Sequence, residues 1–171
     1  MTSITRPQKE DIPLLAEMGK ASFIESHGHS AGAEDINKYV DEKYTRDAFA
    51  DELNDLKHVY YIINCNQQPA GYSKIIFNAT HFNIPIENAT KLERLYLLKE
   101  FYGLKLGREL LQYNIELSRQ NGQAGMWLFV WKENHRAFNF YLKAGFKVVG
   151  SHDFKITETH SNPNYQMLLQ Y

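Results

Sequence analysis

This chain of 171 residues has one cysteine, a net charge close to zero and no long apolar run. The one cysteine, Cys65, allows no internal disulfide, and no histidine–aspartate arrangement supports it as a nucleophile. Nineteen basic and twenty acidic residues give a net charge of −1, which argues against a nucleic-acid partner held by general electrostatics. No apolar stretch approaches the roughly 20 residues that span a membrane, and Met1 to Ser3 lead into a strand without a signal-like run. We therefore expect a cytoplasmic protein.

No linker, repeat or low-complexity tract divides the sequence, so we expect one domain over residues 1–171. Periodicity and turn residues predict a strand near 3–6, a helix from 11 to about 23 and a helical region 33–53 that is divided near Tyr44-Thr45. A hairpin follows, with strands 59–64 and 71–77 joined by the connector 66–70. Two closing strands are predicted at 147–154 and 165–171. A mixed α/β sheet with helices on both sides accounts for this order.

The most informative stretch is a strand followed by a glycine-bearing turn and a helix. Leu95 and Leu97 alternate with polar neighbours over 92–98, the period of a strand. From Leu106 the apolar residues recur at helical spacing, and Gly122 stands where a left-handed C-terminal cap is expected. Between them lies Gly103 to Arg108. Free amides at a helix start carry partial positive charge, and glycines let a diphosphate approach the backbone. An ordinary strand-to-helix connection is the alternative.

A second strand and helix follow this turn. Met126 to Trp131 is a short apolar, aromatic strand, and Asn134 is a good N-cap for a helix that stops at Gly145. Tyr141 lies about two helical turns after Asn134, so one helix could direct both at a common ligand. The alternative for Tyr141 is an aromatic side chain that packs in the core.

Together these segments resemble the GNAT superfamily of acetyl-CoA-dependent N-acetyltransferases. The family's cofactor signature, Gln/Arg-x-x-Gly-x-Gly/Ala, usually with a second-position Gly, aligns with Tyr102 to Gly107, with Tyr102 in place of Gln or Arg and Lys105 in place of the middle Gly. The second signature, Asn-x-x-Ala-x-x-(Phe)-Tyr-x-x-x-Gly-Phe, is met at Asn134, Ala137, Phe140, Tyr141, Gly145 and Phe146. The resemblance implies the GNAT fold and acetyl-CoA as cosubstrate, with no metal. It implies these coenzyme-contacting residues: Leu95, Tyr96, Leu97, Gly103, Leu104, Lys105, Leu106, Gly107, Arg108, Asn134 and Ala137.

The resemblance also assigns chemistry. Tyr141 would donate a proton or hydrogen bond to the departing thiolate of coenzyme A. Glu93 would be the base that takes a proton from the attacking amine, directly or through water. A solvated carboxylate paired with Lys91 is the alternative for Glu93. An amide near Leu97 would polarise the thioester carbonyl, which requires a bulge in the strand.

The N-terminal half resembles bacterial polyamine acetyltransferases of the PaiA type at Ser22-Phe23 to His27-Gly28-His29 and at Glu34-Asp35, as does Trp127-Leu128-x-Val130-Trp131 later in the chain. We accordingly assign Glu25, Tyr44 and His29 to acceptor binding, with solvated helix residues as the alternative for Glu25 and Tyr44. His27 and His29 have no nearby thiolate, so a metal site there is disfavoured. Core and dimer packing is expected for Trp127, Phe129 and Trp131 ahead of the alternative, a substrate cage, and a homodimer is therefore possible.

The sequence thus predicts acetyl transfer from acetyl-CoA to a primary amine, a polyamine or similar small amine, by direct attack in a ternary complex. A peptide or protein amine is the second acceptor class. A non-catalytic acyl-CoA-binding regulatory module is a further alternative, although Tyr141 and Glu93 both being present argues against it. A Rossmann-type dinucleotide site is disfavoured because no acidic residue closes a following βαβ unit.

Overall fold

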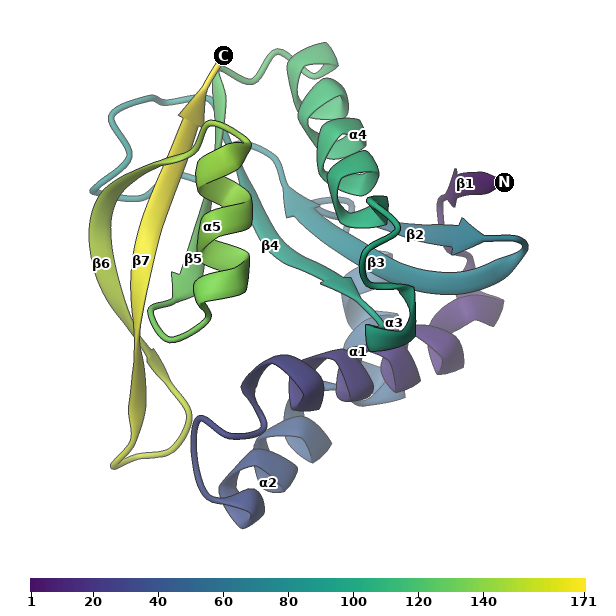
Figure 1. Cartoon of the computed structure of the whole chain (residues 1–171). Coiled ribbons are helices and arrows are strands. Elements are labelled where there is room, and N and C mark those ends of the chain that lie inside the picture. Colours follow the sequence, from purple (N-terminus) through teal and green to yellow (C-terminus); the bar gives the residue numbers. More distant parts are fainter. The chain divides into compact units, whose positions relative to one another are not determined.

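A computed structural model describes all residues, 1–171. The elements in chain order are β1 (Thr2–Thr5), η1 (Lys9–Asp11), α1 (Ile12–His27), α2 (Ala33–Lys43), α3 (Arg46–Asn54), β2 (His58–Cys65), β3 (Gln68–Ile76), β4 (Ala89–Leu97), η2 (Lys99–Phe101), α4 (Leu106–Gln120), β5 (Gly125–Trp131), α5 (His135–Lys143), β6 (Lys147–Lys155) and β7 (Ser161–Gln170). The hydrogen-bonded strand order is β1-β2-β3-β4-β5-β7-β6. Because β4 and β5 are parallel whereas β5–β7 and β6–β7 are antiparallel, the predicted mixed α/β sheet is confirmed (Figure 1).

The chain divides into two compact units, each made of two segments. The first unit contains residues 1–75 and 94–113, and the second contains residues 76–93 and 114–171. The boundary between the units therefore divides strand β4 between residues 93 and 94 and helix α4 between residues 113 and 114. None of the helices is both long enough and apolar enough to cross a membrane.

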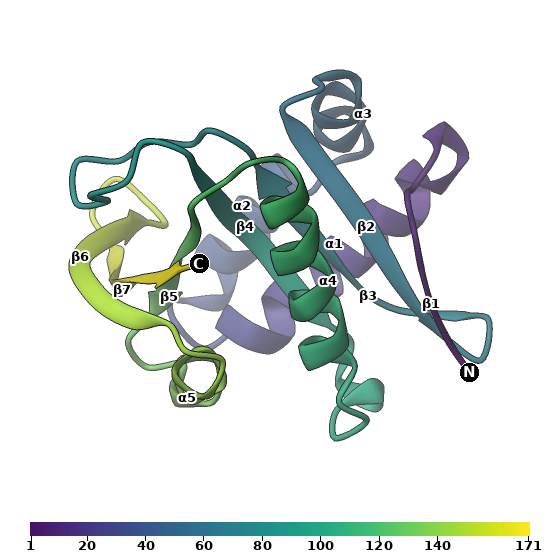
Figure 2. The ribbon, with the colours of Figure 1, turned by 90° about the horizontal axis from the view of Figure 1, so that it is seen from above.

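The first unit carries helices on both faces of its strands. On one face the rings of Tyr60 and Tyr72 stack with centroids 6.3 Å apart, and Phe49 of α3 lies 5.8 Å from Tyr60. Tyr61, the next residue of β2, points the other way and meets Tyr113 of α4 at 4.8 Å. This alternation is the period of two that a strand imposes. In Figure 2, β1 runs beside β2, with which it pairs antiparallel.

The helices of the first unit begin and end where local chemistry predicts, with one extension. Thr45 caps α3 by accepting a hydrogen bond from the amide of Ala48 at 3.1 Å, so the predicted division near Tyr44-Thr45 is confirmed. Helix α1, expected to end near Phe23, continues for a further turn to His27. The extension places a buried Phe23 and a half-buried His27 on one face, where their rings stack 4.8 Å apart.

The β2–β3 hairpin is tighter than the sequence suggested. Asn66 and Gln67 both have left-handed backbones, with φ of 50° and 68°, and β3 begins at the next residue. Two consecutive positive φ values are the geometry of a type I′ turn, whose twist matches the twist of its strands. The expected five-residue connector 66–70 was therefore wrong: Pro69 and Ala70 belong to the strand.

In the second unit, β5 is paired along its whole length with β7, from Gly125↔Gln170 to Trp131↔Asn164. Helix α5 lies beside these strands (Figure 1). Strand β7 starts at Ser161, earlier than the expected residue 165, and includes Pro163. Pro163 lies one residue beyond the last β5 pair, so its missing amide removes no bond from that ladder.

Candidate active site

Strands β4 and β5 pair over a short register only. The parallel pairs are Ala89↔Gly125, Thr90↔Met126 and Lys91↔Trp127. Beyond Trp127, β5 continues for four residues with β7 as its partner. The parallel register of β4 with β5 therefore runs from Ala89 to Lys91, and Leu92 and Glu93 continue β4 in the same unit.

The side-chain alternation of β4 slips by one residue along the strand. The hydroxyl of Thr90 lies 2.6 Å from that of Ser118 on α4. Leu95 packs against the cluster that contains Leu110, also on α4. Thr90 and Leu95 are five positions apart, and a regular strand would turn residues an odd number apart to opposite faces. One extra residue must therefore be accommodated between them, as in a β-bulge.

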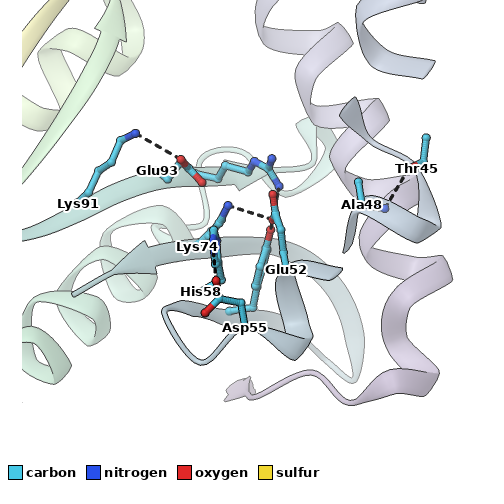
Figure 3. A network of polar contacts seen from close by, with 10 residues as sticks. Thr45, Ala48, Glu52, Asp55, His58, Lys74, Lys91 and Glu93 are labelled. Atoms are coloured by element: carbon cyan, nitrogen blue, oxygen red, sulfur yellow. Dashed lines mark hydrogen bonds and ion pairs between the residues drawn. The ribbon is translucent and has the colours of Figure 1, made fainter. Parts of the chain in front are cut away.

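The slip falls at Glu93 and Arg94. Lys91 and Glu93 form an ion pair of 3.3 Å on one face, as residues two apart in a strand do (Figure 3). Arg94 turns away from Leu95 toward α3, where its guanidinium donates to Glu52 at 3.3 Å. The proposed amide donor near Leu97 requires a bulge in this strand, and these contacts support a bulge at Glu93 and Arg94.

The turn after β4 has the unusual backbone expected of a phosphate-binding loop. Gly103 and Lys105 have φ of 82° and 63°. The carbonyl of Lys105 accepts hydrogen bonds from the amides of Arg108 and Glu109 at 3.0 and 3.2 Å, so α4 starts at the following residue, Leu106. Gly103 to Lys105 are exposed, whereas Leu106 and Gly107 are buried. The first amides of a helix have no acceptor within it, so this turn can offer donors to an anion.

The carboxylate of Glu25 holds the start of this turn. Its Oε2 accepts a hydrogen bond of 3.0 Å from the backbone amide of Lys99, the first residue of η2. Glu25 was assigned to the acceptor amine, and that assignment stays a prediction. The observed contact is with the loop that leads to Gly103.

Helix α5 carries the second predicted motif. The side chain of Asn134 accepts from the amide of Ala137 at 3.1 Å, which confirms it as the N-cap. Gly145 has a φ of 97°, as the predicted helix stop requires. Tyr141 is 8% exposed, and its ring meets the edge of Phe146 at 5.6 Å. The second signature therefore buries the ring of Tyr141 beside Phe146.

Arg94 belongs to a partly buried polar network that the sequence did not reveal. Glu52 of α3 binds the ammonium of Lys74 at 3.0 Å (Figure 3). The same carboxylate binds the guanidinium of Arg94 and accepts a hydrogen bond from Tyr60. Burial alone would raise the pKa of Glu52, but the positive charge of Arg94 and the hydrogen bond of Tyr60 outweigh it and lower the pKa. Burial raises the pKa of Tyr60. These partners are 8 to 42 residues apart in sequence, so no local pattern links them.

The other residues assigned to the acceptor lie in the first unit. Tyr44 is 3% exposed and packs between Phe23 and Phe49, with the guanidinium of Arg94 over its ring at 5.1 Å. Burial raises its pKa. Burial, followed by the charge of His29, lowers the pKa of His27 to about 4, so this imidazole is neutral at neutral pH. Tyr44 and His29 as acceptor ligands stay predictions.

The predicted site residues divide between the two units. The first unit contains the exposed turn, the loop-holding Glu25 and the strand residues Leu95 to Leu97. The second unit contains Glu93, Asn134, Ala137 and Tyr141. The assignment of these residues to coenzyme and catalysis remains a prediction.

Comparison with known proteins identifies the class. The sequence profile of the acetyltransferase (GNAT) family matches residues 24–146. The chain belongs to this family, whose members are acetyl-CoA-dependent acyltransferases.

Individual relatives agree with this class. The chain is 26% identical over 151 residues to an uncharacterised N-acetyltransferase of Lactobacillus delbrueckii subsp. lactis, covering 88% of this chain and 87% of the relative. It is 26% identical over 143 residues to a spermidine N(1)-acetyltransferase of Thermoplasma acidophilum, covering 81% and 84%. The crystal structure of the PaiA N-acetyltransferase of Thermoplasma acidophilum with coenzyme A superposes with a TM-score of 0.79 at 23% identity, covering 100% and 99%, and so shows the same fold.

Proposed function

We propose that this protein transfers an acetyl group from acetyl-CoA to the primary amine of a small molecule, by direct attack in a ternary complex. The observation that carries the proposal is the strand–turn–helix of 89–108 in a chain of the GNAT family, with left-handed residues at Gly103 and Lys105. Polyamines are the first acceptors to test, because a spermidine acetyltransferase is among the relatives.

The coenzyme would bind through the backbone of two segments. The turn from Gly103 to Arg108 would hold the pyrophosphate, with the amides at the start of α4 as donors. Leu95, Tyr96 and Leu97 would run beside the pantetheine arm. The slipped alternation of β4 supports this role, because a bulge frees a backbone amide that an unbroken ladder would occupy. Such a donor to the thioester carbonyl contributes about 3 kcal/mol in acyl transfer.

Glu93 and Tyr141 would serve the two proton movements. An alkylamine is protonated at neutral pH and must lose a proton before attack, for which Glu93 is the proposed base. When the tetrahedral intermediate collapses, the C–S bond breaks and Tyr141 stabilises the leaving thiolate. A phenol of pKa near 10 and a thiol near 8.5 make full proton transfer uphill by roughly 2 kcal/mol, so a hydrogen bond supplies most of the effect.

The experiment is an amine panel with the purified chain and acetyl-CoA, monitored by thiol release and by mass of the product. Gly107→Glu places a bulky anion on the first turn of α4, so it should abolish both coenzyme binding and transfer. Glu116→Gln, which alters an exposed carboxylate on the same helix, is the control. Transfer at the unmutated rate in Gly107→Glu would refute the coenzyme assignment, and no acetylated amine from the unmutated chain would refute the function.

A further inference from the structure

Lys91 of β4 lies in a cation-binding arrangement built by its own chain. Its Nζ is 3.3 Å from the carboxylate of Glu93, 5.4 Å from the ring centroid of Trp127 and 5.7 Å from that of Phe129. One carboxylate and two aromatic faces are the groups that recognise an alkylammonium in proteins. We call Glu93, Trp127 and Phe129 the ammonium cage.

The two rings of the cage are held by contacts that do not involve Lys91. Trp127 is 3% exposed, and its indole Nε1 donates to the carbonyl of Ala79 at 2.8 Å. Phe129 stacks on His152 with centroids 4.6 Å apart and an interplanar angle of 21°. His81 meets the edge of Phe129 at 5.7 Å. The cage is therefore preorganised, and removing the lysine side chain would leave both ring faces in place.

The cage shares its carboxylate with the proposed reaction. Glu93 is the proposed base, and Lys91 and Glu93 are two residues apart on one face of β4, about 7 Å along the strand. A diamine or polyamine whose reacting amine lies at Glu93 would bring its second ammonium close to Trp127 and Phe129, because a short alkyl chain separates the two nitrogen atoms. That position is already taken by the ammonium of Lys91, and two like charges there repel.

We infer that Lys91 is a specificity-determining residue: it fills the site that the second ammonium of a polyamine would take, and so directs the enzyme toward small monoamines. This inference rests on the proposed function and narrows its acceptor class. It also predicts that a single substitution of Lys91 would increase acetyl transfer to polyamines.

The test compares two amines of equal length, 1,3-diaminopropane and n-propylamine, in the unmutated enzyme and in Lys91→Met. Methionine keeps an unbranched apolar side chain and removes the charge. The ratio of kcat/KM for the diamine to that for the monoamine should rise about tenfold in Lys91→Met, the size of a partly desolvated cation–π contact. Any change that the substitution causes in the basicity of Glu93 affects both amines and largely cancels in this ratio. Lys91→Arg, which restores a cation, should return the ratio to its original value.

Lys132→Met is the matched control. Lys132 also lies over an aromatic ring of the second unit, Tyr165, at 4.9 Å, and its loss changes the net charge by the same amount. Its selectivity ratio should equal that of the unmutated enzyme. A rise as large as that in Lys91→Met would mean that general electrostatics controls selectivity, and would overturn the inference.

Direct binding gives a readout that needs no turnover. Tetramethylammonium, titrated against tryptophan fluorescence, should bind Lys91→Met at least tenfold more tightly than the unmutated chain or Lys132→Met. Equal affinity in all three, or an unchanged or lower diamine ratio in Lys91→Met, would overturn the assignment of Lys91. A chain that acetylates no amine yet gains tetramethylammonium binding in Lys91→Met would refute the proposed function and leave the cage supported.

Discussion

Replacing Lys105 by glycine should stabilise this protein, although lysine is the better helix former. Lys105 has a φ of 63°, a conformation that costs a residue with a Cβ about 1–2 kcal/mol. Glycine removes this cost but adds unfolded-chain entropy worth about 0.4–1 kcal/mol. The difference predicts a net gain of about 0.5–1 kcal/mol, or roughly 1–4 °C in Tm for a chain of this length.

The assay is thermal unfolding of the coenzyme-free protein by circular dichroism, supported by urea unfolding. Lys105→Ala is the matched control, because it removes the same charge but keeps the Cβ and therefore the backbone strain. Its stability should not exceed that of the unmutated chain. If Lys105→Gly were no more stable than Lys105→Ala, backbone strain at this turn would not be the dominant effect and the reasoning would be refuted.

Three further predictions concern the proposed reaction. Tyr141→Phe should lower turnover by roughly ten- to a thousandfold with little change in acetyl-CoA affinity, because a hydroxyl acting on the leaving thiolate contributes mainly in the transition state. Stopped-flow kinetics measures the turnover and calorimetry measures the affinity. Turnover equal to that of the unmutated enzyme would show that Tyr141 is only a packing residue. Glu93→Gln should slow transfer at neutral pH, with a deficit that shrinks as pH rises and more free amine is present; parallel pH–rate profiles would contradict a base. Glu25→Ala should weaken acetyl-CoA binding severalfold by releasing the amide of Lys99, with the KM for amine unchanged; a rise in the amine KM alone would restore Glu25 as an acceptor anchor.

Features that depend on nearby residues could be predicted from the sequence. Asn134 as an N-cap, Gly145 and Gly122 as left-handed helix ends, and the break before Thr45 are each set by one residue and its immediate neighbours, and the structure has all four. The order of strands and helices around the turn at Gly103 followed from periodicity in the same way. Short-range chemistry was sufficient because the groups that satisfy each other lie within one or two turns of chain.

Features that depend on distant partners could not be predicted. The hydrogen bond from Lys99 to Glu25 joins residues 74 apart, and a solvated carboxylate and an engaged one look the same in a sequence. The Glu52–Arg94 pair likewise becomes visible only once α3 is placed against β4. The I′ turn at Asn66-Gln67 was missed for another reason: glutamine rarely adopts a positive φ, so its identity gave no signal of a left-handed residue.

The slipped alternation of β4 has a consequence for insertions and deletions. Its early part is fixed by the pair Lys91↔Trp127. Its late part is fixed by Gly71, where an added Cβ would clash with the carbonyl oxygen of Tyr96. Deleting one residue between these anchors would make the strand regular and keep Leu95 and Leu97 on the face that packs against α4, but it would remove the backbone amide that the bulge would free. A chain one residue shorter in β4 is therefore expected to keep the core contacts of this strand and to lose the proposed donor to the thioester.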